Sequence, residues 1–298
     1  MNLQGRVPVT ALVLTFNEEL NLPACLDSLR GWVDRIVVVD SGSNDGTVRI
    51  AEAYGACVLR HPFHTHNTQW RWAIENLPEG ASDWILGLDA DQRVTAELAA
   101  EIRQALGTAR GTPDGVAGYY INRRQIFRGR WIRYGGYYPK YLLKLFRRDG
   151  VSFDENELVD HHFYVRGRTQ LLKHDLIEAN HKEDDLAFWI AKHCRYARLM
   201  AQEEHLRRSA RSEGAAGIRP NLMGSPDHRR LWRKRVWAHM PLYVRPWLYF
   251  SYRYFIRLGF LDGREGFVFH LFQACWFRLM VDVYLDDLRR AGPQSGNL

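Results

Sequence analysis

The stretch Trp84-Ile-Leu-Gly-Leu-Asp-Ala-Asp91 is a short apolar run that stops at two carboxylates one residue apart. The run is too short for a helix and is followed at once by charge, so it predicts a buried β-strand whose C-terminal end carries Asp89 and Asp91. Residues two apart in an extended segment point to the same side, so both carboxylates can face one ligand. Open α/β sheets bind ligands at this end of their strands.

Two neighbouring carboxylates repel each other unless a cation neutralises them. Mg²⁺ and Mn²⁺ take oxygen ligands and can also hold phosphate oxygens. The pattern therefore predicts a divalent metal at Asp89 and Asp91. A solvated Asp-x-Asp turn explains the same pair about equally well, because so short a motif often arises by chance. The rest of the chain has to decide between the two.

Composition and charge narrow the class of protein. The 298 residues carry a formal net charge of +7, with 46% hydrophobic and 25% charged residues, which is ordinary for a globular protein. The positive charge indicates an anionic partner, which can be nucleic acid, a phosphorylated substrate or an anionic membrane surface. The four cysteines are far apart and form no Cys-x-x-Cys pair, so neither a zinc site nor a disulfide framework is expected. This favours a reducing, cytosolic compartment.

The N-terminus shows no secretory signal, and no run of 18 residues is free of charge, so we expect no transmembrane span. Ten Trp, 14 Tyr and 14 Phe are many for a soluble domain. Surfaces that combine aromatic and basic residues suit membrane interfaces.

Strand and helix patterns alternate over the first 90 residues. Apolar runs at 9–14 and 36–39 end in polar residues, and a helical pattern follows each. Asn17 is expected to cap the first helix. The alternation predicts a parallel sheet with helices on both faces, whose polar strand ends at Thr15, Asp40 and Asp89 share one edge.

A nucleotide suits this edge. Asp40 can accept from a base or ribose, the loop 41–47 can donate to an anion, and a metal at Asp89 and Asp91 can neutralise a diphosphate. Ser-Gly and Asp-Gly are also ordinary turn formers, so the loop alone decides nothing. The chain lacks a Gly-x-Gly-x-x-Gly after the first strand and a Gly-Lys-Ser/Thr loop, which argues against a nicotinamide-binding unit and a P-loop.

Three segments together resemble the motifs of inverting family-2 nucleotide-sugar glycosyltransferases of the GT-A fold. They are Thr15-Phe-Asn-Glu-Glu19, Val37-Val-Val-Asp-Ser-Gly-Ser-Asn-Asp-Gly-Thr47 and Leu88-Asp-Ala-Asp-Gln92. The resemblance implies an α/β fold with a mixed, mainly parallel sheet flanked by helices. It also implies a nucleoside-diphosphate sugar donor, with a UDP-sugar favoured, and Mg²⁺ or Mn²⁺ as cofactor. The implied nucleotide-binding residues are Thr15, Asn17, Glu18, Asp40, Ser41, Gly42 and Asp89, and Asp91 would contact the metal.

One segment departs from the family pattern. Bacterial relatives often have Gln-Arg-Asn-Trp-Ala in the helix before the Asp-x-Asp strand, whereas this chain has Gln69-Trp-Arg-Trp-Ala73. Arg71 therefore replaces an Asn that could touch the donor.

An inverting transfer needs a carboxylate that takes the proton of the acceptor hydroxyl. In Asp154-Glu-Asn-Glu-Leu-Val-Asp-His-His162 the resemblance assigns this role to Asp160, although His161 replaces the Glu that relatives carry next to it. Glu157 is the alternative base, and a surface turn of acids and histidines is the structural alternative.

Farther along the chain, the resemblance implies that His181 or Lys182 reaches the metal or the diphosphate. We take His181 as the second metal residue. A lone His at a helix start is more often a polar residue near the cap.

The chain divides by composition into a catalytic domain at 1–206, a polar linker at 207–230 and an aromatic and basic helical extension at 231–298. Within the extension, Leu258-Gly-Phe-Leu-Asp-Gly-Arg-Glu-Gly-Phe267 resembles a tail segment of bacterial polysaccharide-assembly members of the family. Aromatics with embedded arginines suit helices that lie in a membrane interface or a tail packed on the catalytic domain, and we favour the interface. The basic segment 122–139 is expected to be a long loop that forms an acceptor or membrane rim.

These observations predict a hexosyltransferase that moves a sugar to a lipid-linked saccharide or lipopolysaccharide core, at the cytoplasmic face of the cell membrane. A sugar nucleotidyltransferase is the nearest rival, but it would need a glycine-rich basic loop where this chain has Glu18 and Glu19. A non-catalytic protein that binds anionic lipid or nucleic acid is the second rival. Three carboxylate-bearing strand ends would repel a polyanion, so no nucleic-acid partner is expected.

Overall fold

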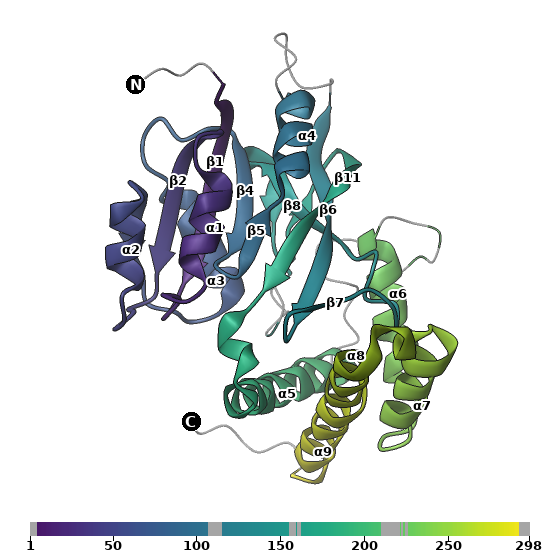
Figure 1. Cartoon of the computed structure of the whole chain (residues 1–298). Helices are drawn as coiled ribbons and strands as arrows, with labels where there is room; N and C mark the ends of the chain where they lie inside the picture. The colour runs from purple at the N-terminus through teal and green to yellow at the C-terminus, as the bar shows by residue number, and fades with distance from the viewer. Residues whose placement is uncertain are drawn as a thin grey trace. The chain divides into compact units, whose positions relative to one another are not determined.

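The computed structural model describes residues 5–106, 115–154, 159, 162–209, 221, 223 and 226–291 (Figure 1). The chain forms two compact units. Unit 1 contains residues 1–131, 137–153 and 162–184, and unit 2 contains residues 132–136, 154–161 and 185–298. Unit 2 therefore takes two short segments from the middle of the chain in addition to the C-terminal helices.

Unit 1 is built on a mixed sheet. In spatial order its strands are β3 (Cys57–Arg60), β2 (Val33–Asp40), β1 (Val7–Thr15), β4 (Trp84–Asp89), β8 (Tyr141–Arg147), β6 (Val116–Phe127), β11 (Arg168–Ala179) and β5 (Gln92–Val94), and β7 (Arg130–Ile132) pairs with β6. The first four run parallel, β8 runs antiparallel to β4 and β6, β6 and β11 are parallel, and β5 is antiparallel to β11. A separate pair is formed by β9 (Val151–Ser152) and β10 (Tyr164–Val165). The expected mixed, mainly parallel sheet is confirmed.

The register of the parallel strands sets the position of the polar strand ends. Thr15 is level with Asp40 in the β1 and β2 pair, and Leu14 is level with Asp89 in the β1 and β4 pair. The three ends thus lie at one edge of the sheet, as the alternating pattern predicted.

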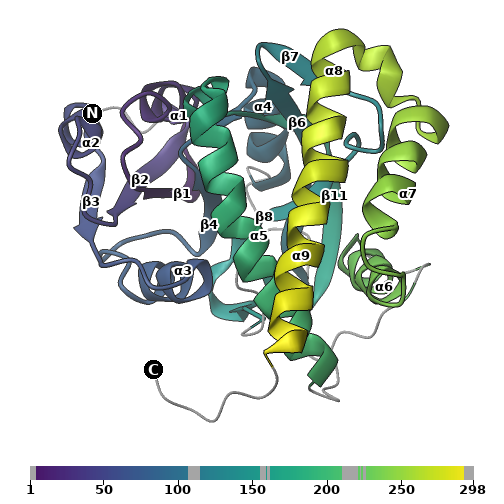
Figure 2. The same cartoon turned by 90° about the horizontal axis from the view of Figure 1, so that it is seen from below.

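Each face of this sheet has its own hydrophobic core, because successive side chains of a strand point to opposite faces. One core joins Val9, Ala11 and Val13 to the helices α1 (Leu22–Leu29), α2 (Thr47–Ala53) and α4 (Ala96–Leu106). The other joins Leu12, Val37 and Val39 to α3 (His66–Glu75). Figure 2 shows α1 and α3 on opposite sides of the strands.

Two local expectations are wrong, and two strands were not predicted. The first helix begins at Leu22, and Asn17 lies in the loop before it with a left-handed φ of 53°, so Asn17 is not its cap. Residues 122–127 continue strand β6, so the expected long loop is shorter. Strands β5 and β11 were not predicted, because their polar residues interrupt the apolar pattern that strand prediction depends on.

Unit 2 is helical. Its helices are α5 (Leu186–Ser209), α6 (Pro226–Ala238), α7 (Arg245–Ser251), α8 (Gly263–His270) and α9 (Phe277–Arg290), with π-helical turns η4 (Tyr252–Ile256) and η6 (Leu271–Trp276) and a 3₁₀ turn η5 (Gly259–Asp262). Helices α5 and α9 lie side by side (Figures 1 and 2). Ala197 and Ala201 of α5 pack there against Phe277, Val281 and Leu285 of α9.

A buried arginine ties α7 to this helix pair. The Arg245 side chain is fully buried and donates to Glu204 of α5 and to Asp282 of α9. Burial opposes the ionisation of Glu204, but the guanidinium groups of Arg245 and Arg208 hold its pKa below the usual range. The charges of Arg245, Glu204 and Asp282 therefore compensate one another.

The Gly-Phe-Leu-Asp-Gly segment binds the mid-chain residues 132–136. Asp262 accepts the backbone N–H groups of Arg133 (3.1 Å) and Tyr134 (2.9 Å), and Arg253 Nε donates to Gly135 O (2.7 Å). Gly135 has a φ of 67°, and a Cβ there would lie 2.1 Å from the His270 ring, so only glycine fits. These contacts hold residues 132–136 within unit 2.

The run Gly259–Arg290 is long and apolar enough to cross a membrane by length and composition, with a mean hydropathy of 1.2 over its most apolar window. In the structure 44% of that window is buried. Asp282, near its C-terminal part, is fully buried and paired with Arg245. Within this run, Phe277, Val281 and Leu285 pack on α5.

Candidate active site

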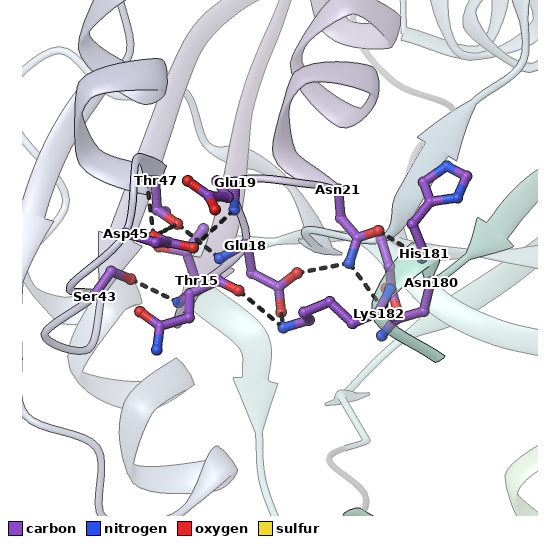
Figure 3. Close-up of polar contacts among 12 residues, drawn as sticks. Thr15, Glu18, Glu19, Asn21, Ser43, Asp45, Thr47, Asn180, His181 and Lys182 are labelled. Carbon is purple, nitrogen blue, oxygen red and sulfur yellow. Dashed lines mark hydrogen bonds and ion pairs between the residues drawn. The ribbon is translucent and has the colours of Figure 1, made fainter. Parts of the chain in front are cut away.

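Two loops at the strand ends of unit 1 are joined by hydrogen bonds (Figure 3). In the loop after β1, the N–H of Asn17 donates to Ser43 Oγ (2.8 Å) and that of Glu18 to Thr47 Oγ1 (2.7 Å). In the reverse direction, Gly46 N–H donates to Glu19 Oε2 (2.9 Å). These bonds give loop 41–47 a defined shape beside the end of β1.

Asp40 shapes the same loop from inside. The carboxylate is 2% exposed and accepts the N–H groups of Gly42 (3.0 Å) and Ser43 (2.9 Å), the Ser43 hydroxyl (2.5 Å) and the Thr15 hydroxyl (3.1 Å). Gly42 has a φ of 90°, which turns the chain back over the carboxylate. Asp40, Thr15, Ser41 and Gly42 are thus brought together, with Asp40 bonded to its own loop.

Sequence reasoning missed Gln69 of α3. Its side chain is fully buried, donates to Ser41 Oγ (3.1 Å) and to His61 O (3.1 Å), and lies 2.7 Å from His61 Nδ1. His61 in turn stacks on Trp72, with ring centroids 4.2 Å apart. Arg71, the departure from the family pattern, is exposed and lies over the Phe153 ring. The contact from α3 to loop 41–47 therefore comes from Gln69.

A chain of polar side chains connects the first loop to the residues after β11 (Figure 3). Lys182 Nζ donates to Glu18 Oε1 (2.5 Å) and to Asn17 O (3.1 Å). Asn21 Nδ2 donates to Glu18 Oε2 (2.8 Å) and to Asn180 Oδ1 (3.0 Å). Asn180 Nδ2 then donates to Asp91 Oδ2 (3.1 Å). Asn21 and Asn180 were not predicted, since neither belongs to a charged motif.

His181 lies beside this chain. Its backbone N–H donates to Asn21 Oδ1 (2.8 Å), its Nε2 lies 2.7 Å from Arg93 NH2, and its Nδ1 lies 3.5 Å from Asp184. Arginine can only donate, so the Arg93 contact makes Nε2 an acceptor. Of the residues after β11, the structure brings Asn180 rather than His181 to Asp91.

At the end of β4, Asp89 forms a second lysine–carboxylate ion pair, with Lys144. Lys144 of β8 is 3% exposed, and its Nζ lies 3.1 Å from Asp89 Oδ2. Beneath the strand end, Cys25 is fully buried, and burial together with the Asp91 and Asp89 charges raises the pKa of its thiol far above the usual value. Cys25 is therefore a neutral packing residue in this site.

The expected base Asp160 and the alternative Glu157 lie outside the described residues. Among the residues that the structure describes, no three His, Cys, Asp or Glu side chains gather into a ready-made metal centre. The Asp91 and Asp89 carboxylates nevertheless fit Mg²⁺ or Mn²⁺, because such ions are commonly held by one or two carboxylates together with substrate phosphates.

Comparison with known proteins identifies the family. The model described as glycosyl transferase family 2 matches residues 10–173, more than half of the chain. A Rhizobium meliloti protein named lipopolysaccharide core biosynthesis glycosyltransferase LpsC is 28% identical over 164 residues, which cover 52% of this chain and 56% of that protein. A Rickettsia felis protein described as an uncharacterized glycosyltransferase is 39% identical over 94 residues, 32% of each chain. These matches span about a third to just over half of the relatives' length.

Among solved structures, one neighbour is glucosyl-3-phosphoglycerate synthase from Mycobacterium tuberculosis, in complex with Mn²⁺, UDP and phosphoglyceric acid. It is 16% identical, with a TM-score of 0.42 over 71% of this chain and 81% of that chain. The family model covers the chain from within β1 to within β11, including both loops at the strand ends. The mixed sheet is the one that the motifs predicted. The chain therefore belongs to glycosyl transferase family 2.

Proposed function

We propose that this enzyme transfers a sugar, with inversion, from a nucleoside-diphosphate sugar to a lipid-linked saccharide or lipopolysaccharide-core acceptor. The observation that carries the proposal is the convergence of Glu18, Lys182, Asn180 and Asp91 at the ends of β1, β4 and β11. This edge places a metal-type carboxylate, Asp91, near a lysine, Lys182, beside the loop 41–47 that Asp40 and Glu19 hold in shape. A carboxylate that can hold a metal and a lysine are groups that suit a nucleoside diphosphate.

The nucleoside end of the donor would lie against Thr15, Asn17, Glu18, Asp40, Ser41, Gly42 and Asp89. Asp40 holds loop 41–47 in place through its four hydrogen bonds, so its role includes shaping the pocket. We favour UDP over other nucleotides on the likeness of these motifs. Lys182, held at Glu18, would supply positive charge toward the diphosphate.

Mg²⁺ or Mn²⁺ would be held by Asp91, beside Asp89. When bound, the metal would stabilise the charge that develops on the leaving diphosphate. Asn180 fixes the Asp91 carboxylate through its 3.1 Å hydrogen bond. His181 would join this site only by giving up its contact with Arg93.

The acceptor hydroxyl would lose its proton to Asp160, with Glu157 as the alternative, while its oxygen attacks the anomeric carbon. The glycosidic bond to the diphosphate breaks as the new bond forms, which inverts the configuration. The LpsC relative supports an acceptor of the lipopolysaccharide-core class. An acceptor of that class would place the enzyme at an anionic membrane surface on the cytoplasmic side.

Calorimetric titration of UDP and GDP, with and without Mn²⁺, tests the donor site. We expect one nucleotide to bind in the presence of metal, and Asp91→Asn to weaken that binding at least tenfold. Asp149→Asn is the matched control, since that carboxylate is 75% exposed in a surface pair with Arg147. If neither nucleotide binds under any metal condition, the proposed donor site is wrong.

A second measurement tests the base. Asp160→Asn should keep donor binding and lose transfer to acceptor, because only proton removal is affected. Retained transfer in Asp160→Asn together with loss in Glu157→Gln would move the role to Glu157.

A further inference from the structure

Helix α7 and turn η4 of unit 2 expose apolar side chains to solvent and bury charged ones. Their exposed positions follow helical spacing and are apolar apart from Ser251: Val244, Trp247, Leu248, Ser251, Tyr252, Phe255 and Ile256. Their buried positions include two arginines, Arg245 (0% exposed) and Arg253 (7% exposed). A surface helix of a soluble protein shows the opposite distribution.

The buried arginines are part of the fold. Arg245 is bound to Glu204 and Asp282, and Arg253 to Gly135 O and to the Tyr249 hydroxyl (2.7 Å). These bonds fix which side of the helix faces inward. The same contacts therefore keep the apolar side turned outward. We call this side, formed by Val244, Trp247, Leu248, Tyr252, Phe255 and Ile256, the α7 stripe.

The apolar surface continues beyond the stripe. Leu258, Phe260, Leu261 and Phe267 are 42–46% exposed, and about half of the exposed large apolar side chains in the described part of the chain lie between Tyr243 and Phe267. A groove of about 260 Å³ adjoins the stripe at Trp247 and is lined only by apolar atoms. Its other walls are Leu271, Phe272, Cys275, Trp276 and Leu279, which belong to η6 and the start of α9.

The exposed charge in this part of the chain is mainly basic. Arg233, Arg235, Arg257 and Arg264 are exposed, whereas the acidic residues in the sequence between Trp232 and Phe267 are Asp262 and the half-buried Glu265. Asp262 is 2% exposed and bound to backbone N–H groups. A basic rim around aromatic and aliphatic side chains is complementary to an anionic lipid surface, where apolar groups enter the acyl region and arginines meet the phosphates.

We propose that the α7 stripe inserts into the interface of an anionic phospholipid bilayer, and that the groove at Trp247 takes one hydrocarbon chain of a lipid. This contact lies in the plane of the membrane and needs no spanning helix. Only the role of this contact, which is to bring the enzyme to a lipid-linked acceptor, rests on the proposed function.

Vesicle flotation of the full chain tests the stripe. Wild type should float with vesicles of phosphatidylglycerol and phosphatidylcholine, and less with phosphatidylcholine alone. Phe255→Ser with Ile256→Ser should lower the partition coefficient at least tenfold, since these side chains are 59% and 71% exposed. Phe63→Ser with Leu171→Ser is the matched control in unit 1, where the side chains are 49% and 52% exposed, and it should float like wild type.

A double charge reversal tests the basic residues around the stripe. Arg257→Glu with Arg264→Glu should reduce flotation with phosphatidylglycerol vesicles several-fold, and Arg103→Glu on α4 should not. Flotation of the stripe variant at the wild-type level overturns the proposal. A wild-type dimer that the stripe variant converts to monomer, with vesicle binding unchanged, would also overturn it by assigning the stripe to a second copy of the chain.

Cross-linking tests the groove. Phosphatidylglycerol with a diazirine in its acyl chain should label Trp247 or residues 271–279, and labelling confined to other peptides would refute the groove. UDP titration of the same proteins reports separately on the proposed function. If the wild-type protein floats with vesicles but binds no UDP, the proposed donor site is wrong and the proposed membrane contact is still supported.

Discussion

Lys144 and Asp89 form an ion pair across adjacent antiparallel strands of unit 1, with Nζ of the lysine 3.1 Å from the carboxylate. The lysine side chain is 4% exposed and that of Asp89 is 33% exposed. Lys144 also lies over the Phe163 ring. The Asp-x-Asp end of β4 therefore carries a protein cation beside its first carboxylate.

Lys144→Met should destabilise the fold by about 1–3 kcal/mol, less than for a fully buried pair because solvent reaches Asp89. Nucleotide affinity should fall about tenfold as the carboxylate loses its fixed position, and Lys144→Arg should restore part of both. Urea unfolding and UDP titration measure the two effects. The exposed Lys173→Met is the control, and an equal change there would contradict a specific role for Lys144.

The Glu18 and Lys182 pair joins loop 17–21 to the residues after β11, and its side chains are only 16% and 19% exposed. A double-mutant cycle with Glu18→Gln and Lys182→Met should give a coupling energy of about 1–2 kcal/mol in unfolding free energy. The surface pair of Arg147 and Asp149 should give less than about 0.5 kcal/mol. Equal coupling in the two cycles would show that the Glu18 pair has no special strength.

Arg245→Met should cost about 3–5 kcal/mol, because it leaves the buried Asp282 without its guanidinium partner and leaves Glu204 with Arg208 alone. Arg245→Lys should recover little, since an ammonium cannot bridge both carboxylates as the planar guanidinium does. Thermal unfolding measures the loss. Arg290→Met on α9 is the control: its side chain is 76% exposed in a pair with Asp286, and the change should cost less than about 0.5 kcal/mol.

His270 predicts a loss of stability in acid. Burial, with a smaller contribution from Arg253, lowers the pKa of this imidazole to about 3. Asp262 lies 4.0 Å from His270 Nε2, and its carboxylate also accepts the backbone N–H groups of Arg133 and Tyr134. The unfolded chain takes up a proton near pH 6.5 and the folded chain does not, so this stabilisation is complete above pH 6.5 and is lost as the pH falls toward 3.

The slope should reach about 1.4 kcal/mol per pH unit below pH 6.5. Urea unfolding between pH 4.5 and 7.5 measures it. His270→Gln should flatten the profile, and the exposed His239→Gln should leave it unchanged. A wild-type profile without this slope would show that His270 is protonated in the folded enzyme.

Much of the candidate site could be predicted from the sequence, because the features that determine it are local. Apolar runs that stop at Thr15, Asp40 and Asp89 predict strand ends, and parallel pairing necessarily brings such ends to one edge. The motif likeness then led to the family, since it depends on residues within a few positions of one another.

Contacts between distant segments could not be predicted. Lys144, Asn21 and Asn180 belong to no motif, and nothing local in the segment 69–73 marks the contact that Gln69 makes. Lys144 and Asn180 reach the site through the pairings of β8 and β11, and Gln69 reaches it through the packing of α3. Asn17 illustrates the same limit, because its left-handed backbone follows from hydrogen bonds to a loop 26 residues away.

The α7 stripe shows most clearly what the sequence determines and what the tertiary structure determines. Its helical spacing of apolar residues is visible in the sequence, but periodicity alone says only that one side is apolar and not which side faces solvent. That choice was made by Glu204, Asp282 and Gly135, whose bonds draw the arginines inward. The sequence by itself determined the strand ends and the chemistry that they carry, because both are set by short-range pattern. Only the tertiary structure decided which distant partners neutralise those charges and which face of α7 is left exposed to solvent, because both depend on groups far apart in the chain.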